Sequence, residues 1–283
     1  MKTLKAVFKA FLAVLIAIVT LELGRYLGLL ILLKLFDTVN LNADTYALAP
    51  GWLRYAADNT DSITGLIALL MAFAVLLILR GLLKPEKRVL TFSHIFMGLF
   101  SGALSLFLIR LLTELDCIRV IRPLPGWDIM NLALVILTAA VSALLIRGCV
   151  CEILNDELPR WALVAVSAVL QAGLFSLMYG RLNPVLLINS ACLGAAAAVV
   201  YTGGGALYCE ICAFGGFLAA ERCLPGRFPS ANVYSVSSPL ITGGDCGLEA
   251  SLTLTLVILL LAVLFVVLVK GAKSSGKKAS VHR

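Results

Sequence analysis

Charged residues and histidines are scarce in this chain. Only 14% of its 283 residues are charged and two are histidines, whereas 61% are hydrophobic and the mean hydropathy is +1.01. A soluble globular domain carries roughly 25% charged and 45–50% apolar residues. The composition therefore excludes a soluble enzyme, a disordered protein and a nucleic-acid-binding protein. The net charge is +7, and most Lys and Arg residues lie at the ends of apolar runs, where such residues set the orientation of a membrane protein.

The shortage of histidine also limits the chemistry that the chain can perform. A metalloprotease of the His-Glu-x-x-His type needs two histidines four residues apart, and this chain has only His94 and His282. A Ser-His-Asp hydrolase would depend on His94, and no serine lies in a nucleophile-elbow sequence. The sequence also lacks an internal repeat and the matched broken helices of an inverted-repeat transporter.

Long apolar runs fill most of the chain, and each is about as long as a membrane-spanning helix. Barrel strands would be about 10 residues long and would alternate strictly between apolar and polar residues. We therefore predict an all-α fold, a polytopic membrane helical bundle in which residues 1–283 form a single membrane domain. The eight predicted spans are residues 10–32, 62–79, 92–113, 129–146, 161–179, 184–201, 205–221 and 251–269.

The basic residues predict how these spans cross the membrane. With the N-terminus in the cytoplasm, the inner segments carry 14 Lys and Arg residues and the outer segments carry six. Cytoplasmic loops of membrane proteins are enriched in Lys and Arg. This asymmetry selects eight spans with both termini in the cytoplasm, because an odd number would place the Lys-rich C-terminal tail outside.

Two local patterns predict contacts within the bundle. Glu22 and Arg25 lie three residues apart in the first span and share a helix face. We expect them to form a structural ion pair that faces the bundle, although an ionisable residue inside a span is also a functional candidate. Ser190, Gly194 and Ala198 form a face of small residues in the sixth span, which predicts close packing against another helix.

Four of the eight cysteines form two close pairs, Cys149-x-Cys151 and Cys209-x-x-Cys212. Four thiolates could bind zinc tetrahedrally, which makes these residues candidate metal ligands. The alternative is that they are small apolar residues buried in helices, as free cysteines often are. We favour the second interpretation, because zinc sites usually lie on loops or turns, and we expect no cofactor.

The second half of the chain, residues 140–270, contains a recognisable order of motifs. The stretches that form it are Ser142–Gly148, Leu174–Tyr179, Leu182-Asn183-Pro184, Tyr201–Tyr208, Ile211–Leu218 and Thr242–Glu249. Their order resembles that of the CPBP (Abi) family of CAAX-processing and bacteriocin-processing intramembrane endopeptidases. Members of that family carry a Glu-Glu-x-x-x-Arg motif, then a histidine, then a His-x-x-x-Asn pair.

The resemblance implies a scaffold whose catalytic groups have been replaced. The first glutamate of the family is thought to activate a water molecule, supported by the histidines and the asparagine. Ser142 cannot serve as such a base, and Phe214 and Leu218 have no polar side-chain atoms. The family-equivalent positions are Ser142, Ala143, Arg147, Tyr179, Phe214 and Leu218.

The resemblance therefore implies an inactive pseudoprotease in the bacterial cytoplasmic membrane. It would bind a hydrophobic or prenylated peptide, or a membrane-protein partner, in bacteriocin self-immunity or in secretion. Its surroundings would be the lipid bilayer, and nucleic acid is not expected as a partner.

Two other functions stay open at the level of sequence. Glu210, or less directly Glu152, could replace the missing base and make the chain an active endopeptidase; we prefer a Glu210 that pairs with Arg147 or reaches the headgroups. A small transporter would need a charged path through the spans, for which only Glu22, Arg25, Arg110 and Glu210 are available.

Overall fold

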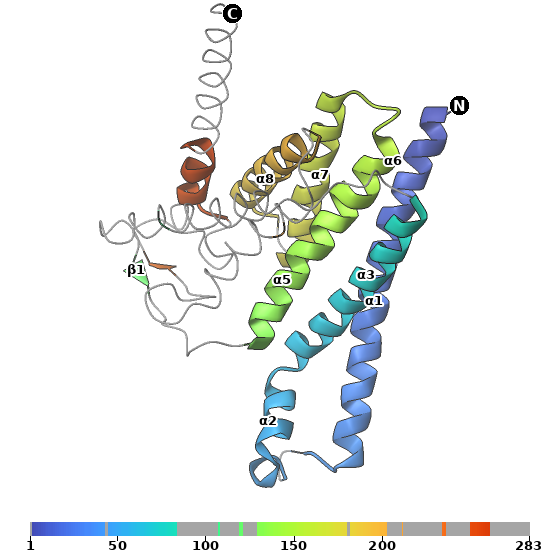
Figure 1. Ribbon diagram of the computed structural model, residues 1–283. Coiled ribbons are helices and arrows are strands. Elements are labelled where there is room, and N and C mark those ends of the chain that lie inside the picture. Colours follow the sequence, from blue (N-terminus) through green and yellow to red (C-terminus); the bar gives the residue numbers. More distant parts are fainter. Residues whose placement is uncertain are drawn as a thin grey trace, which may run out of the picture.

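The computed structural model describes residues 2–42, 45–83, 107, 119–120, 129–179, 182–202, 211, 234–235 and 250–260. These residues are almost entirely helical (Figure 1). The one ladder among them joins two-residue strands, β1 (Arg119–Val120) and β2 (Tyr234–Ser235), in antiparallel register. The helices are α1 (Lys2–Thr38), α2 (Gly51–Asp58), α3 (Thr60–Leu83), α5 (Ile129–Ala143), the π-helix η2 (Leu144–Cys151), α6 (Glu152–Leu154), α7 (Arg160–Tyr179), α8 (Pro184–Thr202) and a segment over residues 252–260, with a 3-10 turn, η1, at Tyr46–Leu48.

Four helices are long and apolar enough to cross a membrane, and they coincide with the first, second, fourth and fifth predicted spans. They are Lys2–Thr38, Thr60–Leu83, Leu132–Leu154 and Arg160–Leu177. The sixth predicted span is helical as well, but its apolar part, Pro184–Val199, is shorter than these four. Apart from residues 107 and 211, the predicted spans 92–113 and 205–221 lie outside the described residues, as do residues 261–269. The helical fold is confirmed, whereas eight spans and two cytoplasmic termini stay predictions.

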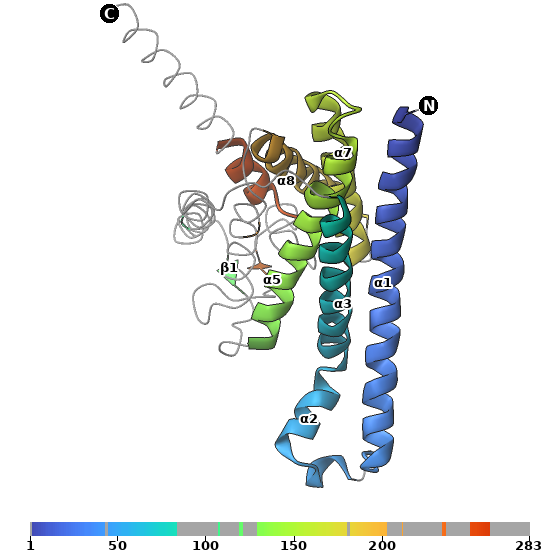
Figure 2. The same ribbon diagram turned by 45° about the vertical axis from the view of Figure 1, so that its right-hand side comes forward.

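Helices α1 and α3 pack antiparallel through small residues, and they lie side by side in both side views (Figures 1 and 2). Gly24 meets Ala68 so closely that a Cβ atom on Gly24 would lie 2.6 Å from the Cα atom of Ala68. Close backbone approach stabilises helix pairs in lipid, where apolar burial gives no drive. Small residues recur every three or four positions along this face of α1: Ala6, Ala10, Ala13, Ala17, Thr20, Gly24 and Gly28.

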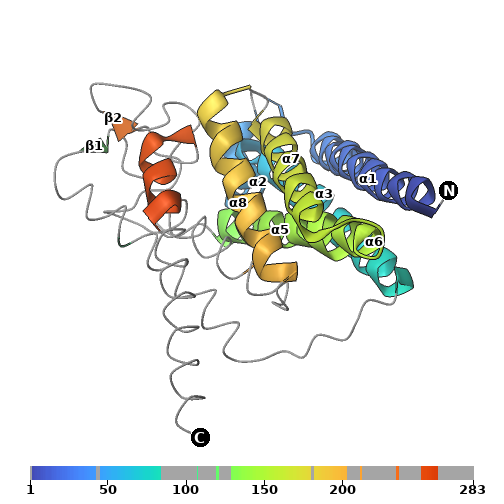
Figure 3. The ribbon, with the colours of Figure 1, turned by 90° about the horizontal axis from the view of Figure 1, so that it is seen from above.

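The centre of the described bundle is one continuous helix formed by α5, η2 and α6. In its apolar stretch, within Leu132–Leu154, 78% of the residues are buried, against 28% or less in the other three candidate spans. Helices α1 and α3 pack against this central helix, and α7 also contacts its π-helical part. Seen from above, α8 lies beside α7 on the side away from α1, and the segment 252–260 lies beyond α8 (Figure 3). The central helix is therefore where buried polar chemistry is to be sought.

Helices α7 and α8 form a hairpin whose turn and interface both follow from the sequence. The Oδ1 atom of Asn183 accepts hydrogen bonds from the backbone N–H groups of Val185 and Leu186, at 2.9 and 3.3 Å. Asn at the N-cap followed by Pro184 at the first helical position is a common way to begin a helix. The small face predicted in the sixth span is buried, and its Gly194 contacts α7. That prediction is confirmed.

The connection between α1 and α3 contains structure that the sequence prediction did not include. α1 continues to Thr38, beyond the predicted limit at residue 32. The prediction marked the end of the apolar run, and a helix can continue past the end of such a run. Asn40 ends α1 in the left-handed conformation, with φ at 51°, and the N–H of Leu41 donates to the carbonyl of Phe36 at 2.9 Å. This is the hydrogen-bond pattern of a Schellman cap. The short helix α2 follows.

Tyr46 and Asp58 form a hydrogen bond within this connection, and we expect its effect on the titration of Tyr46 to be measurable. The Tyr46 hydroxyl donates to Oδ1 of Asp58 at 2.6 Å, and this hydrogen bond raises the pKa of Tyr46. A raised tyrosine pKa means that the contact stabilises the fold below the unfolded value of about 10 and is lost as pH rises through the folded value. In ultraviolet difference titrations against Tyr46→Phe, we expect a phenol that ionises above pH 10. Asp58→Asn should lower that pKa; an unchanged titration would contradict the assignment.

Candidate functional site

The most unusual polar group in the described bundle is Arg147, which lies in the π-helix at the centre of the fold. Its side chain is the largest that is fully buried among the described residues, with 2% exposed. Its Nη1 atom donates to Oε1 of Gln171 on α7 at 2.8 Å. π-helical turns are rare, usually short, and frequent at functional sites. All eight residues of this one, Leu144–Cys151, are buried. We therefore take the Arg147–Gln171 contact as the centre of the candidate site.

Ser142 and Ala143, the two positions predicted to match the family's glutamates, lie on the same central helix and are buried. Ser142 is 1% exposed and Ala143 is 0% exposed. The Ser142 hydroxyl donates to the carbonyl of Ala139 on its own helix at 3.0 Å. A hydroxyl bonded back to its own helix does not activate a water molecule. At these two positions the structure provides no general base.

Among the described residues, no other position predicted to match the family motifs lies beside Arg147. Tyr179 is the last residue of α7 and lies eight residues beyond Gln171, which is about 12 Å along the helix axis. Phe214, Leu218 and the alternative base Glu210 lie outside the described residues. A single chamber lined by all of these positions therefore stays a prediction.

Sequence reasoning missed Gln171 as the partner of Arg147. Gln171 is 3% exposed and is the only glutamine of the chain. A side-chain amide inside an apolar span needs a hydrogen-bonding partner, because lipid offers none. This signal identifies Gln171 as a residue that must pair, but it does not identify the partner, which lies 24 residues away on another helix.

A second polar contact joins the end of the central helix to the end of α8. The Tyr201 hydroxyl donates to Oε2 of Glu152 at 2.6 Å. Hydrogen bonds from a hydroxyl to a carboxylate are short and strong. Glu152, considered above as a substitute base, therefore holds α8 in place through its carboxylate.

A third polar contact joins α8 to the segment 252–260. Asn189 is 1% exposed; its Nδ2 atom donates to the carbonyl of Ser251 at 2.9 Å, and its Oδ1 atom accepts from the Thr255 hydroxyl at 2.6 Å. Ser251 also caps the segment, because its Oγ atom accepts from the N–H of Leu254 at 3.1 Å. The three polar contacts all connect one helical segment to another, and interhelical hydrogen bonds of this kind are common between apolar helices.

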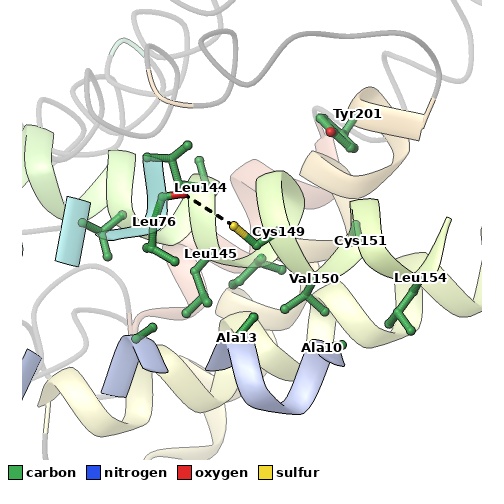
Figure 4. Close-up of a cluster of buried hydrophobic side chains, with 14 of the residues drawn as sticks. Ala10, Ala13, Leu76, Leu144, Leu145, Cys149, Val150, Cys151, Leu154 and Tyr201 are labelled. Carbon is green, nitrogen blue, oxygen red and sulfur yellow. Dashed lines mark hydrogen bonds between the residues drawn. The ribbon is translucent and has the colours of Figure 1, made fainter. Parts of the chain in front are cut away.

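The described cysteine pair lies inside an apolar cluster. Cys149 and Cys151 are 0% and 1% exposed, and the Cys149 sulfur lies 3.9 Å from the carbonyl oxygen of Leu76 (Figure 4). Figure 4 also shows Ala10 and Ala13 of α1 packed beneath this stretch of the central helix. The other two candidate zinc ligands, Cys209 and Cys212, lie outside the described residues. Among the residues that the structure places, no three His, Cys, Asp or Glu side chains gather as a metal site would require.

The predicted ion pair of the first span forms, but its orientation was predicted wrongly. Arg25 Nη1 lies 3.5 Å from Glu22 Oε1, and the two side chains are 57% and 68% exposed. The pair points away from the bundle because α3 packs on the opposite, small-residue face of α1. For a transporter, this places two of its four candidate charges outside the bundle, while Arg110 and Glu210 lie outside the described part of the chain.

Comparisons with protein-family models, with curated proteins and with solved structures give no match to this chain. The likeness to the CPBP family therefore depends on the order of its motifs. One of those motifs, Leu182-Asn183-Pro184, has a local explanation, since Asn183 caps α8. Capping sequences of this kind occur in unrelated helical proteins.

Proposed function

We propose that this chain is a multi-pass membrane protein on a CPBP-like scaffold that binds a hydrophobic or prenylated peptide, or a membrane-protein partner, without hydrolysing it. The observation that carries the proposal is the state of the two glutamate-equivalent positions. They hold a serine and an alanine that are almost completely buried, and the serine hydroxyl is used within its own helix. Loss of a single oxyanion donor already lowers an enzyme's rate by about 10²–10³, and here the base itself is replaced.

The position of charged and aromatic residues supports a membrane location with a cytoplasmic N-terminus. The Thr3 hydroxyl donates to Oε2 of Glu157 at 2.9 Å, so the start of α1 lies beside the turn between α6 and α7. Both of these segments belong to the basic, inner side of the predicted topology. On the connection between α1 and α3, Trp52 and Tyr55 of α2 are 60% and 46% exposed. Exposed Trp and Tyr on short helices are typical of the membrane–water interface.

The buried Arg147 has a structural role in this proposal. A cation that is 2% exposed and bonded to Gln171 cannot reach a peptide without disrupting the contact between the central helix and α7. We infer that it preserves the shape of the scaffold while the hydrolytic groups are absent. The bound peptide would recognise apolar surface and would not require general acid–base chemistry.

Binding and turnover should be measured together with the full-length protein in lipid nanodiscs. A fluorescent farnesylated CAAX peptide is expected to bind saturably and to remain intact over hours. The same peptide without the farnesyl group is the matched control, and it should bind at least about tenfold more weakly, because a prenyl chain adds much of the apolar area.

Two results would contradict the proposal. Cleavage of the peptide that disappears in the Glu210→Gln variant would show an active enzyme with a relocated base. Equal or absent binding of both peptides to correctly folded, membrane-inserted protein would remove the peptide-binding function and leave only the membrane bundle.

A further inference from the structure

Exposed and mostly large apolar residues cover much of α1 away from α3, and one line of them runs along the face opposite α3. The spacing along this line alternates between three and four residues, which is the heptad pattern of helices that pair along a seam. Most members are large and apolar, but the stripe is interrupted by Glu22 and Arg25, which are 68% and 57% exposed. This outer stripe consists of Phe8, Phe11, Leu15, Ile18, Glu22, Arg25 and Leu29.

The position of the ion pair along α1 makes contact with lipid unfavourable. The apolar run of α1 is bounded by Lys9 and Lys34, and Glu22 lies midway between them, about 18–20 Å along the axis from each. In a membrane-spanning α1, Glu22 and Arg25 therefore lie near the centre of the bilayer. Charged residues at that depth are rare and almost always face protein or water. The exposed pair thus indicates that a protein surface covers the outer stripe.

We propose that a second copy of this chain covers the outer stripe, with Glu22 of each copy paired with Arg25 of the other. Copies in one membrane are related by a two-fold axis along the membrane normal, so each residue meets the partner's residues at its own depth. An acidic and a basic residue three positions apart are then self-complementary, because each contact occurs twice in an isologous interface. The flanking apolar residues, such as Leu15 and Ile18, would supply the packing of the seam.

This inference depends on the membrane location proposed above and not on peptide binding. Its geometry uses the part of α1 that faces away from α3 and the central helix, so dimerisation would leave the described helix contacts unchanged. The interface pairs like helices in parallel, as neighbouring membrane helices often do with crossing angles near 20°.

Charge reversal tests the reciprocal pairing. Two differently tagged full-length chains are expressed together, extracted in native lipid particles, and one tag is captured while the other is quantified. The wild-type chain is expected to capture itself. Glu22→Arg alone and Arg25→Glu alone should each lower self-capture at least about tenfold, because like charges then face each other. Co-expression of the Glu22→Arg chain with the Arg25→Glu chain should restore capture, which an ion pair confined to one chain cannot do.

Controls separate the possible failures. Lys34→Glu reverses a charge at the edge of the span and should leave self-capture unchanged. If a reversed charge prevents insertion, the apolar Glu22→Leu/Arg25→Leu variant should insert normally and be monomeric. A wild-type chain that inserts as a monomer, or the lack of rescue between two inserted variants, would overturn the dimer but not the membrane location. A wild-type chain that does not enter the membrane would overturn both.

Discussion

Replacing Gly194 by leucine will separate α7 from α8 and lower the free energy of unfolding by about 3 kcal/mol or more. A Cβ atom at Gly194 would lie 2.6 Å from Cβ of Gln171 and 2.7 Å from the carbonyl oxygen of Ser167. These atoms belong to the backbone or lie next to it, so no side-chain rotation relieves the overlap. The Ser167 hydroxyl also donates to the Gly194 carbonyl at 2.8 Å, and separation of the helices would leave this buried group unpaired.

Gly173→Leu is the matched control for this variant. Gly173 lies on α7, and a Cβ atom there would meet nothing within 4 Å. Both variants exchange a helical glycine for the same residue, so any gain in helix propensity is shared. Unfolding in mixed micelles, followed by far-ultraviolet circular dichroism during a titration with sodium dodecyl sulfate, should show a large loss for the Gly194 variant only. Equal unfolding midpoints would mean that α7 and α8 do not meet at Gly194.

Gln171→Leu should lower the free energy of unfolding by about 1.5–3 kcal/mol, the range for hydrogen bonds to charged groups. This exceeds the average of about 0.6 kcal/mol for hydrogen bonds between membrane helices, because the donor here is a buried guanidinium. Arg147→Met should be destabilising as well, since it leaves Oε1 of the buried Gln171 without this donor.

A double-mutant cycle isolates the contact between the two side chains. The Arg147→Met/Gln171→Leu variant replaces both partners by apolar groups of similar size, so its loss of stability should be smaller than the sum of the two single losses by about 1–2 kcal/mol. In the control cycle, Arg147→Met is combined with Tyr46→Phe, which shares no partner with it, and the effects should add within about 0.5 kcal/mol. Additivity in the first cycle as well would show that Arg147 and Gln171 do not interact.

Part of the candidate site could be predicted from the sequence, and part could not. From the order of its motifs, the sequence predicts that Ser142 and Ala143 stand where the CPBP family has two glutamates and that Arg147 is retained; this alignment stays a prediction. The burial of these residues and the pairing of Arg147 with Gln171 were not predictable, because they depend on which face of the central helix α7 covers. The small-residue face of α1 is visible as Gly24-x-x-x-Gly28, but the prediction considered this pattern only in later spans.

The sequence by itself determined that the described bundle is helical, and it placed the four helices of membrane-spanning length and the shorter α8. An apolar run of about 20 residues must satisfy its backbone hydrogen bonds within itself in lipid, and only a helix does so. It also determined that Glu22 and Arg25 pair, because residues three apart on a helix are neighbours whatever surrounds them. Only the tertiary structure decided that this pair faces outward, that Asn189 joins α8 to the segment 252–260, and that Arg147 is held by α7. These outcomes depend on how whole helix surfaces pack, and residues far apart in the chain decide that together.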